Sequence, residues 1–163
     1  MGIVYQEADF DDLHEVAELY NEFLFSLKDI TKDPYFDFAE LSVKDRAKLL
    51  KDRFLEEKGL VVVAREEESR EIIGFISMAV MNCFLVVSSV REIGYIEGAY
   101  VKKAYRRQGI LSKLEEMLTN HLLGKGIRYL ELNTIANNQM ANDSWQKLGY
   151  RVFRQQWRKD LHE

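Results

Sequence analysis

The stretch "YVKKAYRRQGILSKLEEML", residues 100–118, places two arginines, a glutamine and a glycine directly before an amphipathic helical pattern. The first turn of an α-helix leaves backbone N–H groups without intrahelical partners, and the helix dipole adds positive potential there. Gly109 permits close approach of a ligand to those amides, while Arg106 and Arg107 add charge and forked donors. The pattern is typical of a phosphate-binding helix N-terminus, although a plain helix start with two solvated arginines has the same sequence.

The two commoner phosphate motifs do not fit this stretch. The Walker pattern ends in Gly-Lys-Ser/Thr, which is absent here, and the dinucleotide fingerprint requires three spaced glycines where this stretch has one. The stretch therefore indicates an anion site of another kind.

Outside this stretch, apolar residues follow helical spacing in some segments and strand-like runs in others. Helices are predicted at residues 9–28, 43–59, 109–124 and 138–149, and strands at 2–8, 60–68, 71–82, 91–102, 127–135 and 150–161. This order predicts an α/β (α+β) fold in which about four helices flank a mostly antiparallel mixed sheet of about six to seven strands. We see no linker or repeat, and we expect one domain over residues 1–163.

The composition indicates a globular protein of a reducing compartment. The 163 residues are 47% hydrophobic and 31% charged, and the one cysteine, Cys83, lies in an apolar run that favours a buried, inert thiol. No segment resembles a signal peptide, and the longest apolar runs are shorter than a membrane span. We therefore expect a cytoplasmic protein without a membrane partner.

Charge is distributed unevenly along the chain. Residues 1–80 hold 10 Lys/Arg and 19 Asp/Glu, a net charge of −9, whereas residues 81–163 hold 13 and 8, a net charge of +5. The two halves either serve ligands of opposite charge or reflect the solvated faces of the first helices. Because the chain is acidic overall and has no continuous basic stripe, nucleic-acid binding is disfavoured.

Two spaced motifs resemble those of the GNAT superfamily of N-acetyltransferases. Arg106 and Gly109 match the first two fixed positions of the family's Gln/Arg-x-x-Gly-x-Gly/Ala signature, which follows a strand ending in Val. The stretch "NQMANDSWQKLGYRVF", residues 138–153, is similar to its Asn-x-x-Ala and Lys-Leu-Gly-Phe/Tyr element. The order of predicted elements agrees with that fold along nearly the whole chain.

The resemblance implies acetyl transfer from acetyl-CoA to a primary amine by direct attack in a ternary complex. It assigns the pantetheine arm to the backbone of Ala99, Tyr100 and Val101, and the thioester end to Asn138. The pyrophosphate would lie in a nest at residues 107–112, which are Arg107, Gln108, Gly109, Ile110, Leu111 and Ser112, with Arg106 as a further cofactor-binding residue beside it.

The chain departs from the family pattern at three positions. Leu111 stands where the signature has Gly or Ala, Trp145 where many members have a proton-donating tyrosine, and Asn133 where some have a glutamate base. An indole N–H donates hydrogen bonds but is no proton donor at neutral pH, so the thiolate would leave with another donor or without one. These departures leave a non-catalytic acyl-CoA-binding or regulatory domain as the alternative.

An acceptor amine is an ammonium ion at neutral pH and must lose a proton before it attacks the thioester, so the reaction needs a base. Glu97 is the first candidate, because it lies on the strand that leads to the cofactor stretch and within an apolar run where burial raises a carboxyl pKa. Glu131 is the second. The alternative for Glu97 is a glutamate that faces solvent.

The acceptor amine is expected to be cationic, either a small molecule or a protein. Between residues 29 and 40, aromatic residues alternate with Asp29, Asp33 and Asp37, which suits either a cation pocket or a solvated loop. The histidines lack partners at ligand spacing, so no metal is expected. The segment "YRVFRQQW", residues 150–157, can also pair between chains, which would give a homodimer.

Overall fold

The computed structural model describes residues 2–38, 43–56 and 59–162. The chain forms two compact units, Met1–Asn133 and Thr134–Glu163, and each is considered by itself. The first holds the sheet and three of the four α-helices, and the second holds one helix and the C-terminal segment.

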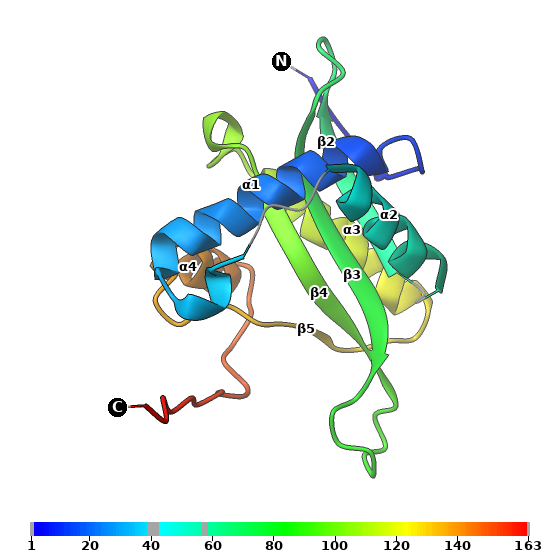
Figure 1. Ribbon diagram of the computed structural model, residues 1–163. Helices are drawn as coiled ribbons and strands as arrows, with labels where there is room; N and C mark the ends of the chain where they lie inside the picture. Colours follow the sequence, from blue (N-terminus) through cyan, green and yellow to red (C-terminus); the bar gives the residue numbers. More distant parts are fainter. Residues whose placement is uncertain (1, 39–42, 57–58, 163) are drawn as a thin grey trace. The chain divides into compact units, whose positions relative to one another are not determined.

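The first unit is built on a mixed five-stranded sheet (Figure 1). Its strands are β1 (Ile3–Glu7), β2 (Gly59–Glu66), β3 (Ile72–Asn82), β4 (Glu92–Val101) and β5 (Leu130–Leu132), and they lie side by side in chain order. The pairs from β1 to β4 are antiparallel, and β4 pairs with β5 in parallel. The predicted fold class is confirmed, with one strand fewer than the lowest number expected.

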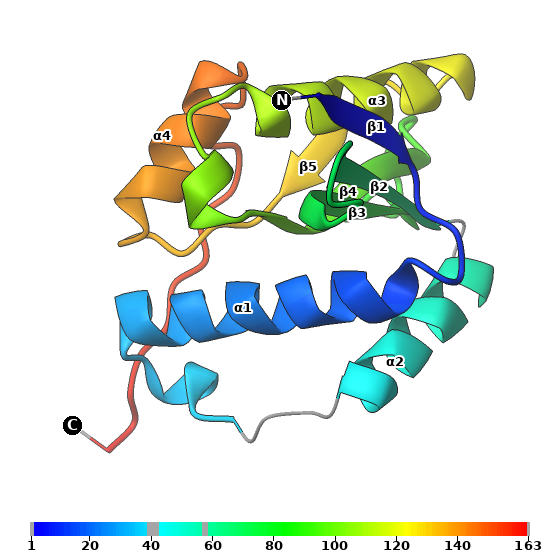
Figure 2. The same cartoon turned by 90° about the horizontal axis from the view of Figure 1, so that it is seen from above.

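Helices cover both faces of this sheet (Figure 2). Helices α1 (Leu13–Thr31) and α2 (Val43–Glu56) pack on one face, and α3 (Ile110–Gly124) packs against β2, β3 and β4 on the other. A short 3-10 turn, η1 (Pro34–Phe36), follows α1. Among the residues described, no helix is long and apolar enough to cross a membrane.

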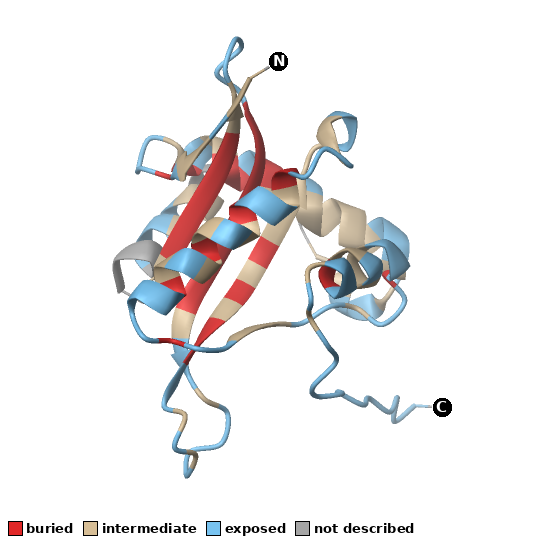
Figure 3. Cartoon of the chain, turned by 180° about the vertical axis from the view of Figure 1, so that it is seen from behind, coloured by how far each residue is buried: buried red, intermediate tan, exposed pale blue. Residues whose placement is uncertain are grey.

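The core lies along β2 and β3, where buried residues run almost without interruption (Figure 3). A strand with both faces covered has no solvent side, so its sequence shows a continuous apolar run instead of alternation. This explains why the runs at 60–68 and 71–82 were recognisable as strands. Cys83, just beyond β3, is a free thiol that is only half-buried, less than the sequence suggested.

The second unit contains α4 (Gln139–Lys147), which confirms the predicted helix, but the strand predicted at 150–161 is wrong. This segment carries no helix or strand, and Val152 and Trp157 are 76% and 87% exposed. Its sequence puts apolar Val152 and Phe153 side by side and spreads four cations over the rest, so neither strand face is apolar. Pairing of this segment between two chains stays a prediction.

Candidate active site

The stretch before α3 folds into a tight loop with two left-handed residues, Arg107 (φ 64°) and Gly109 (φ 77°). Gly109 is the N-cap residue of α3, and its carbonyl oxygen accepts the N–H of Lys113 at 3.1 Å. A Cβ built on Gly109 would meet no atom within 4 Å, so the backbone here faces open space. Left-handed turns that aim successive N–H groups to one side are typical of anion-binding concavities.

The packing of α3 holds this loop in place. The residues of α3 that face the sheet are buried at helical spacing: Ile110, Leu114, Leu118 and Leu122. Leu111 is half-buried and Ser112 is exposed, so the backbone amides of the first turn remain the groups that an anion would meet. The departure at Leu111 therefore changes a side chain and leaves the backbone amide in place.

The two arginines of the loop take different positions. Arg107 is exposed, whereas Arg106 is half-buried and turns back toward β4. The Arg106 Nε donates a hydrogen bond to the carbonyl oxygen of Val101 at 2.8 Å, and its guanidinium lies 5.3 Å from the ring centroid of Tyr100. Gln108, which is exposed, donates through Nε2 to the carbonyl oxygen of Ala104 at 3.4 Å. Of the two arginines, Arg107 is therefore the exposed one, and it is itself one of the two left-handed residues.

Tyr100 is held between α1 and this loop. Burial raises the pKa of the Tyr100 hydroxyl, and the charge of Glu22 on α1 and a hydrogen bond to it raise the pKa further. Arg106 acts in the opposite direction through its charge and its hydrogen bond. The hydroxyl therefore lies between an anion and a cation that belong to different elements.

Glu97 occupies a β-bulge in β4. Ser77 of β3 pairs with Gly98 and Met78 pairs with Ile96, so Glu97 stands as the extra residue between them. Two hydroxyls reach this bulge: Tyr20 donates to the Glu97 carbonyl oxygen at 3.4 Å, and Ser77 donates to the Gly98 carbonyl oxygen at 3.5 Å.

The bulge directs Glu97 into a small hollow of about 20 Å³ on the face covered by α1 and α2. The hollow is lined by Leu50, Gly59, Leu60, Val61, Ser77, Met78 and Glu97. Bulges reorient side chains next to active sites, and a carboxylate among mostly apolar neighbours suits a proton-accepting role.

Glu131 lies on the same face of the sheet as Glu97. It pairs directly with Tyr95, and Tyr95 is two residues before Glu97 on β4. Paired residues share a face, and Tyr95 faces away from its neighbour Gly94, where a Cβ would meet Leu122 of α3 on the opposite side of the sheet. The structure thus brings both candidate carboxylates to the face covered by α1 and α2.

Beyond Ile96, β4 has no further partner in β5. The pairing of the two strands covers Gly94, Tyr95 and Ile96 only, because β5 ends at Leu132. On its other side β4 stays paired with β3 as far as Val101. Along Ala99–Val101, one edge of β4 therefore has no strand beside it among the residues that the structure describes.

In the second unit, Asn138 and Trp145 have structural contacts. Asn138 is the N-cap of α4, and its side-chain oxygen accepts the N–H of Ala141 at 3.3 Å. Trp145 is buried and packs edge-on against Tyr150, with ring centroids 5.2 Å apart. The cap uses the side-chain oxygen of Asn138, and the contacts of Trp145 are those of a packing residue. A contact between Asn138 and a ligand stays a prediction.

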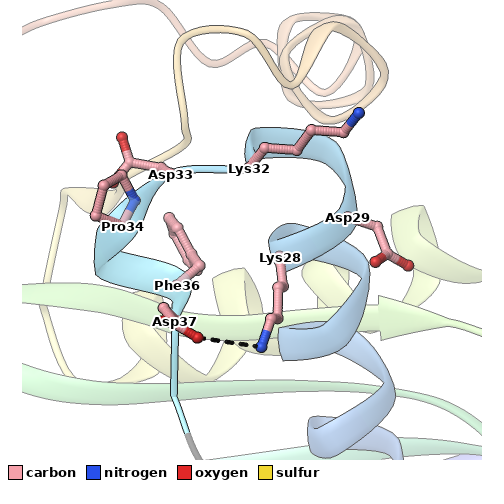
Figure 4. Close-up of a pocket in the computed structure, with 7 residues that line it drawn as sticks. All are labelled: Lys28, Asp29, Lys32, Asp33, Pro34, Phe36 and Asp37. Carbon is pink, nitrogen blue, oxygen red and sulfur yellow. Dashed lines mark ion pairs between the residues drawn. The ribbon is translucent and has the colours of Figure 1, made fainter.

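A larger hollow of about 530 Å³ lies where α1 ends and η1 begins (Figure 4). It is lined by Lys28, Asp29, Lys32, Asp33, Pro34, Phe36 and Asp37. Lys28 Nζ lies 3.6 Å from Asp37 Oδ1, and the Asp33 carboxylate accepts the N–H of Tyr35 at 2.9 Å. The three expected aspartates thus line one hollow, and Lys28 and Lys32, which were not expected there, line it as well. Residues 39 and 40 of that expected segment lie outside the described residues.

No group of three or more His, Cys, Asp or Glu side chains that could hold a metal ion occurs in the described parts of the chain.

The family model of the acetyltransferase (GNAT) family matches residues 13–150, which is most of the chain. The protein belongs to this family and is an acetyltransferase. No curated protein matches the chain.

Solved structures share the fold over nearly the full length. A tetramutant of a Bacillus halodurans protein has a TM-score of 0.83 at 20% identity and covers 97% of this chain and 99% of its own. A predicted acetyltransferase from Clostridium acetobutylicum, solved with acetyl-CoA, has a TM-score of 0.74 at 18% identity and coverages of 99% and 97%. An aminoglycoside 6'-N-acetyltransferase from Acinetobacter baumannii has a TM-score of 0.73 at 15% identity and coverages of 98% and 98%.

Proposed function

We propose that the protein transfers the acetyl group of acetyl-CoA to a primary amine of a cationic acceptor, by direct attack in a ternary complex. One observation carries the proposal. Strand β4 bears the bulged Glu97, then the open edge at Ala99–Val101, and leads into the left-handed loop at Gly109. A base, an edge for an extended ligand and an anion site thus follow one another along the chain.

The residues on the donor side fit acetyl-CoA. An extended pantetheine arm can add to the open edge of β4 as a peptide strand would, through the backbone of Ala99–Val101. The first-turn amides of α3 and the exposed Arg107 suit the pyrophosphate. The Clostridium acetobutylicum relative, which has the same fold, was solved with acetyl-CoA, and this supports the same donor here.

On the acceptor side, the Glu97 carboxylate takes a proton from the substrate ammonium, either directly or through a water. The freed amine nitrogen forms a bond to the acetyl carbon and loses its second proton to solvent, and the carbon–sulfur bond breaks. Its electron pair leaves with sulfur as a thiolate, which takes up a proton from solvent. A thiol of pKa about 8.5 is a fair leaving group, so the reaction can proceed without a tyrosine at Trp145.

A cationic acceptor is supported by charge. The first 80 residues carry a net charge of −9, and the hollow of Figure 4 is lined by three aspartates against two lysines. The aminoglycoside acetyltransferase of Acinetobacter baumannii has the same fold, which supports an amine-bearing substrate.

The test is turnover of acetyl-CoA with a panel of aminoglycosides, polyamines, amino sugars and peptide N-termini, followed as released thiol. We expect thiol release with a subset of cationic amines and none with neutral hydroxyl compounds. Tight binding of CoA without turnover across the panel would contradict the proposal. That outcome would favour an acyl-CoA-binding domain, for which the buried, packed Trp145 is the supporting observation.

A further inference from the structure

Arg106 makes contacts within the protein that the binding of a phosphate group would not require. Its Nε is committed to the carbonyl oxygen of Val101, and its guanidinium covers the ring of Tyr100. A guanidinium has five donors in one rigid plane, so fixing Nε on a carbonyl also fixes the direction of the other four. Arg106 is thus tied to the last two residues of β4 before the loop begins.

Tyr100 extends this connection to helix α1. Its hydroxyl lies near enough to Glu22 of α1 and to Arg106 for both to shift its pKa, and its ring packs against the core cluster that contains Phe75. These contacts connect α1, the end of β4 and the loop.

We propose that Arg106 is a positioning residue, which fixes the end of β4 and the start of the phosphate loop in one geometry and does not bind the pyrophosphate with its charge. This rests on the proposed function, in which the donor lies along β4 and across that loop. Arg107 then supplies the positive charge that attracts the pyrophosphate, and Arg106 keeps the end of β4 and the loop in place.

This assignment has a measurable consequence for the two halves of the donor. A site that is already ordered loses less conformational entropy when it binds a ligand. Without Arg106, the carbonyl of Val101 and the loop that follows would have to be ordered by the ligand itself. Loss of Arg106 would therefore weaken binding of the pantetheine arm as well as of the pyrophosphate, whereas loss of Arg107 would weaken binding of the pyrophosphate only.

The experiment compares R106Q with the matched control R107Q on two donors, acetyl-CoA and S-acetylpantetheine, which lacks the pyrophosphate. We expect R106Q to raise KM for both donors by a similar factor, about tenfold. We expect R107Q to raise KM for acetyl-CoA only. If R106Q raises KM for acetyl-CoA and leaves that for S-acetylpantetheine unchanged, Arg106 is a phosphate ligand and the proposal is wrong.

The conservative variant R106K separates charge from geometry. Lysine keeps the charge but lacks the planar fork, so we expect R106K to be as impaired as R106Q. Rescue by R106K would overturn the proposal. Thermal unfolding of each variant identifies any that fails to fold, and R106K then takes the place of R106Q in the comparison of donors.

A salt titration gives a readout independent of turnover. Calorimetric binding of CoA and of pantetheine is measured in increasing NaCl. A direct charge contact makes affinity fall with salt, so we expect R107Q to flatten the salt dependence for CoA and R106Q to keep the wild-type slope. If the wild type binds both ligands but turns over neither donor, the proposed function fails, while the binding comparison still decides the role of Arg106.

Discussion

The hydroxyl of Tyr20 on α1 donates a hydrogen bond to the carbonyl oxygen of Glu97, the bulged residue of β4, at 3.4 Å. The ring of Tyr20 also stacks on Phe75, with centroids 5.6 Å apart. A Cβ on Gly98 would lie 2.8 Å from the Tyr20 ring, so glycine at this position lets the helix approach the bulge. The first helix therefore helps to fix the backbone that carries the candidate base.

We expect Tyr20→Phe to lower kcat by about tenfold, because small displacements of a catalytic group are costly. The free energy of unfolding should fall by only about 1 kcal/mol, the net contribution of one hydrogen bond. Steady-state kinetics and urea unfolding measure the two quantities. An unchanged kcat with the same loss of stability would mean that the contact serves packing alone.

Glu97→Gln should lower the rate at neutral pH by about 10²-fold or more, because the substrate ammonium loses its base. The fall should be smaller at high pH, where free amine is already present. Glu131→Gln is the matched control, since it removes a carboxylate from the same face of the sheet and should have little effect. The pH–rate profiles of the three proteins decide between them, and a reversed order of effects would assign the base to Glu131.

Gly109→Ala should abolish or strongly weaken CoA binding while the fold persists. Its φ of 77° makes a side chain costly by about 1 kcal/mol, and the added methyl group occupies the side where the ligand would approach. Gly126, with φ 74° and equally open surroundings, provides a control with the same backbone strain outside the loop. Calorimetry should show that Gly126→Ala binds CoA normally. Equal binding by both variants would contradict the pyrophosphate assignment.

The raised pKa of Tyr100 predicts how its contribution to stability depends on pH. The folded state favours the neutral hydroxyl, so the contribution is fully present below the unfolded pKa of about 10 and is lost as pH rises through the higher folded pKa. The difference in unfolding free energy between the wild type and Tyr100→Phe should be constant up to about pH 10 and shrink above it. Urea unfolding across this pH range measures the difference. A difference that grows with pH would show that folding lowers the pKa of Tyr100 instead of raising it.

The central elements were predictable because their signals are local. The strand expected at 71–82 is β3, and the helix expected at 109–124 is α3, each correct to within one residue. Strong apolar runs and a glycine before a periodic stretch fix such elements wherever they lie in the fold.

The details of the site depend on contacts between distant segments. The bulge at Glu97 arises from its register with Ser77 and Met78, twenty or so residues away, and no local pattern announces it. The direction of Arg106 is set by Tyr100 and Val101, because a rotamer follows from packing and not from motif spacing. The C-terminal strand was wrong for a related reason. Aromatic and β-branched residues suggested pairing, but strand propensity depends on having a neighbour to pack against.

Leu111 shows what kind of description suits this site. What the position contributes is a backbone amide in the first turn of α3, and its side chain is half-buried. A search pattern written in residue letters, which demands Gly or Ala there, would discard this chain. A pattern written in backbone angles, with left-handed residues at 107 and 109 followed by a helix, would retain it. Distant members of such families are better identified by the backbone conformation of the loop than by the residue types in its motif.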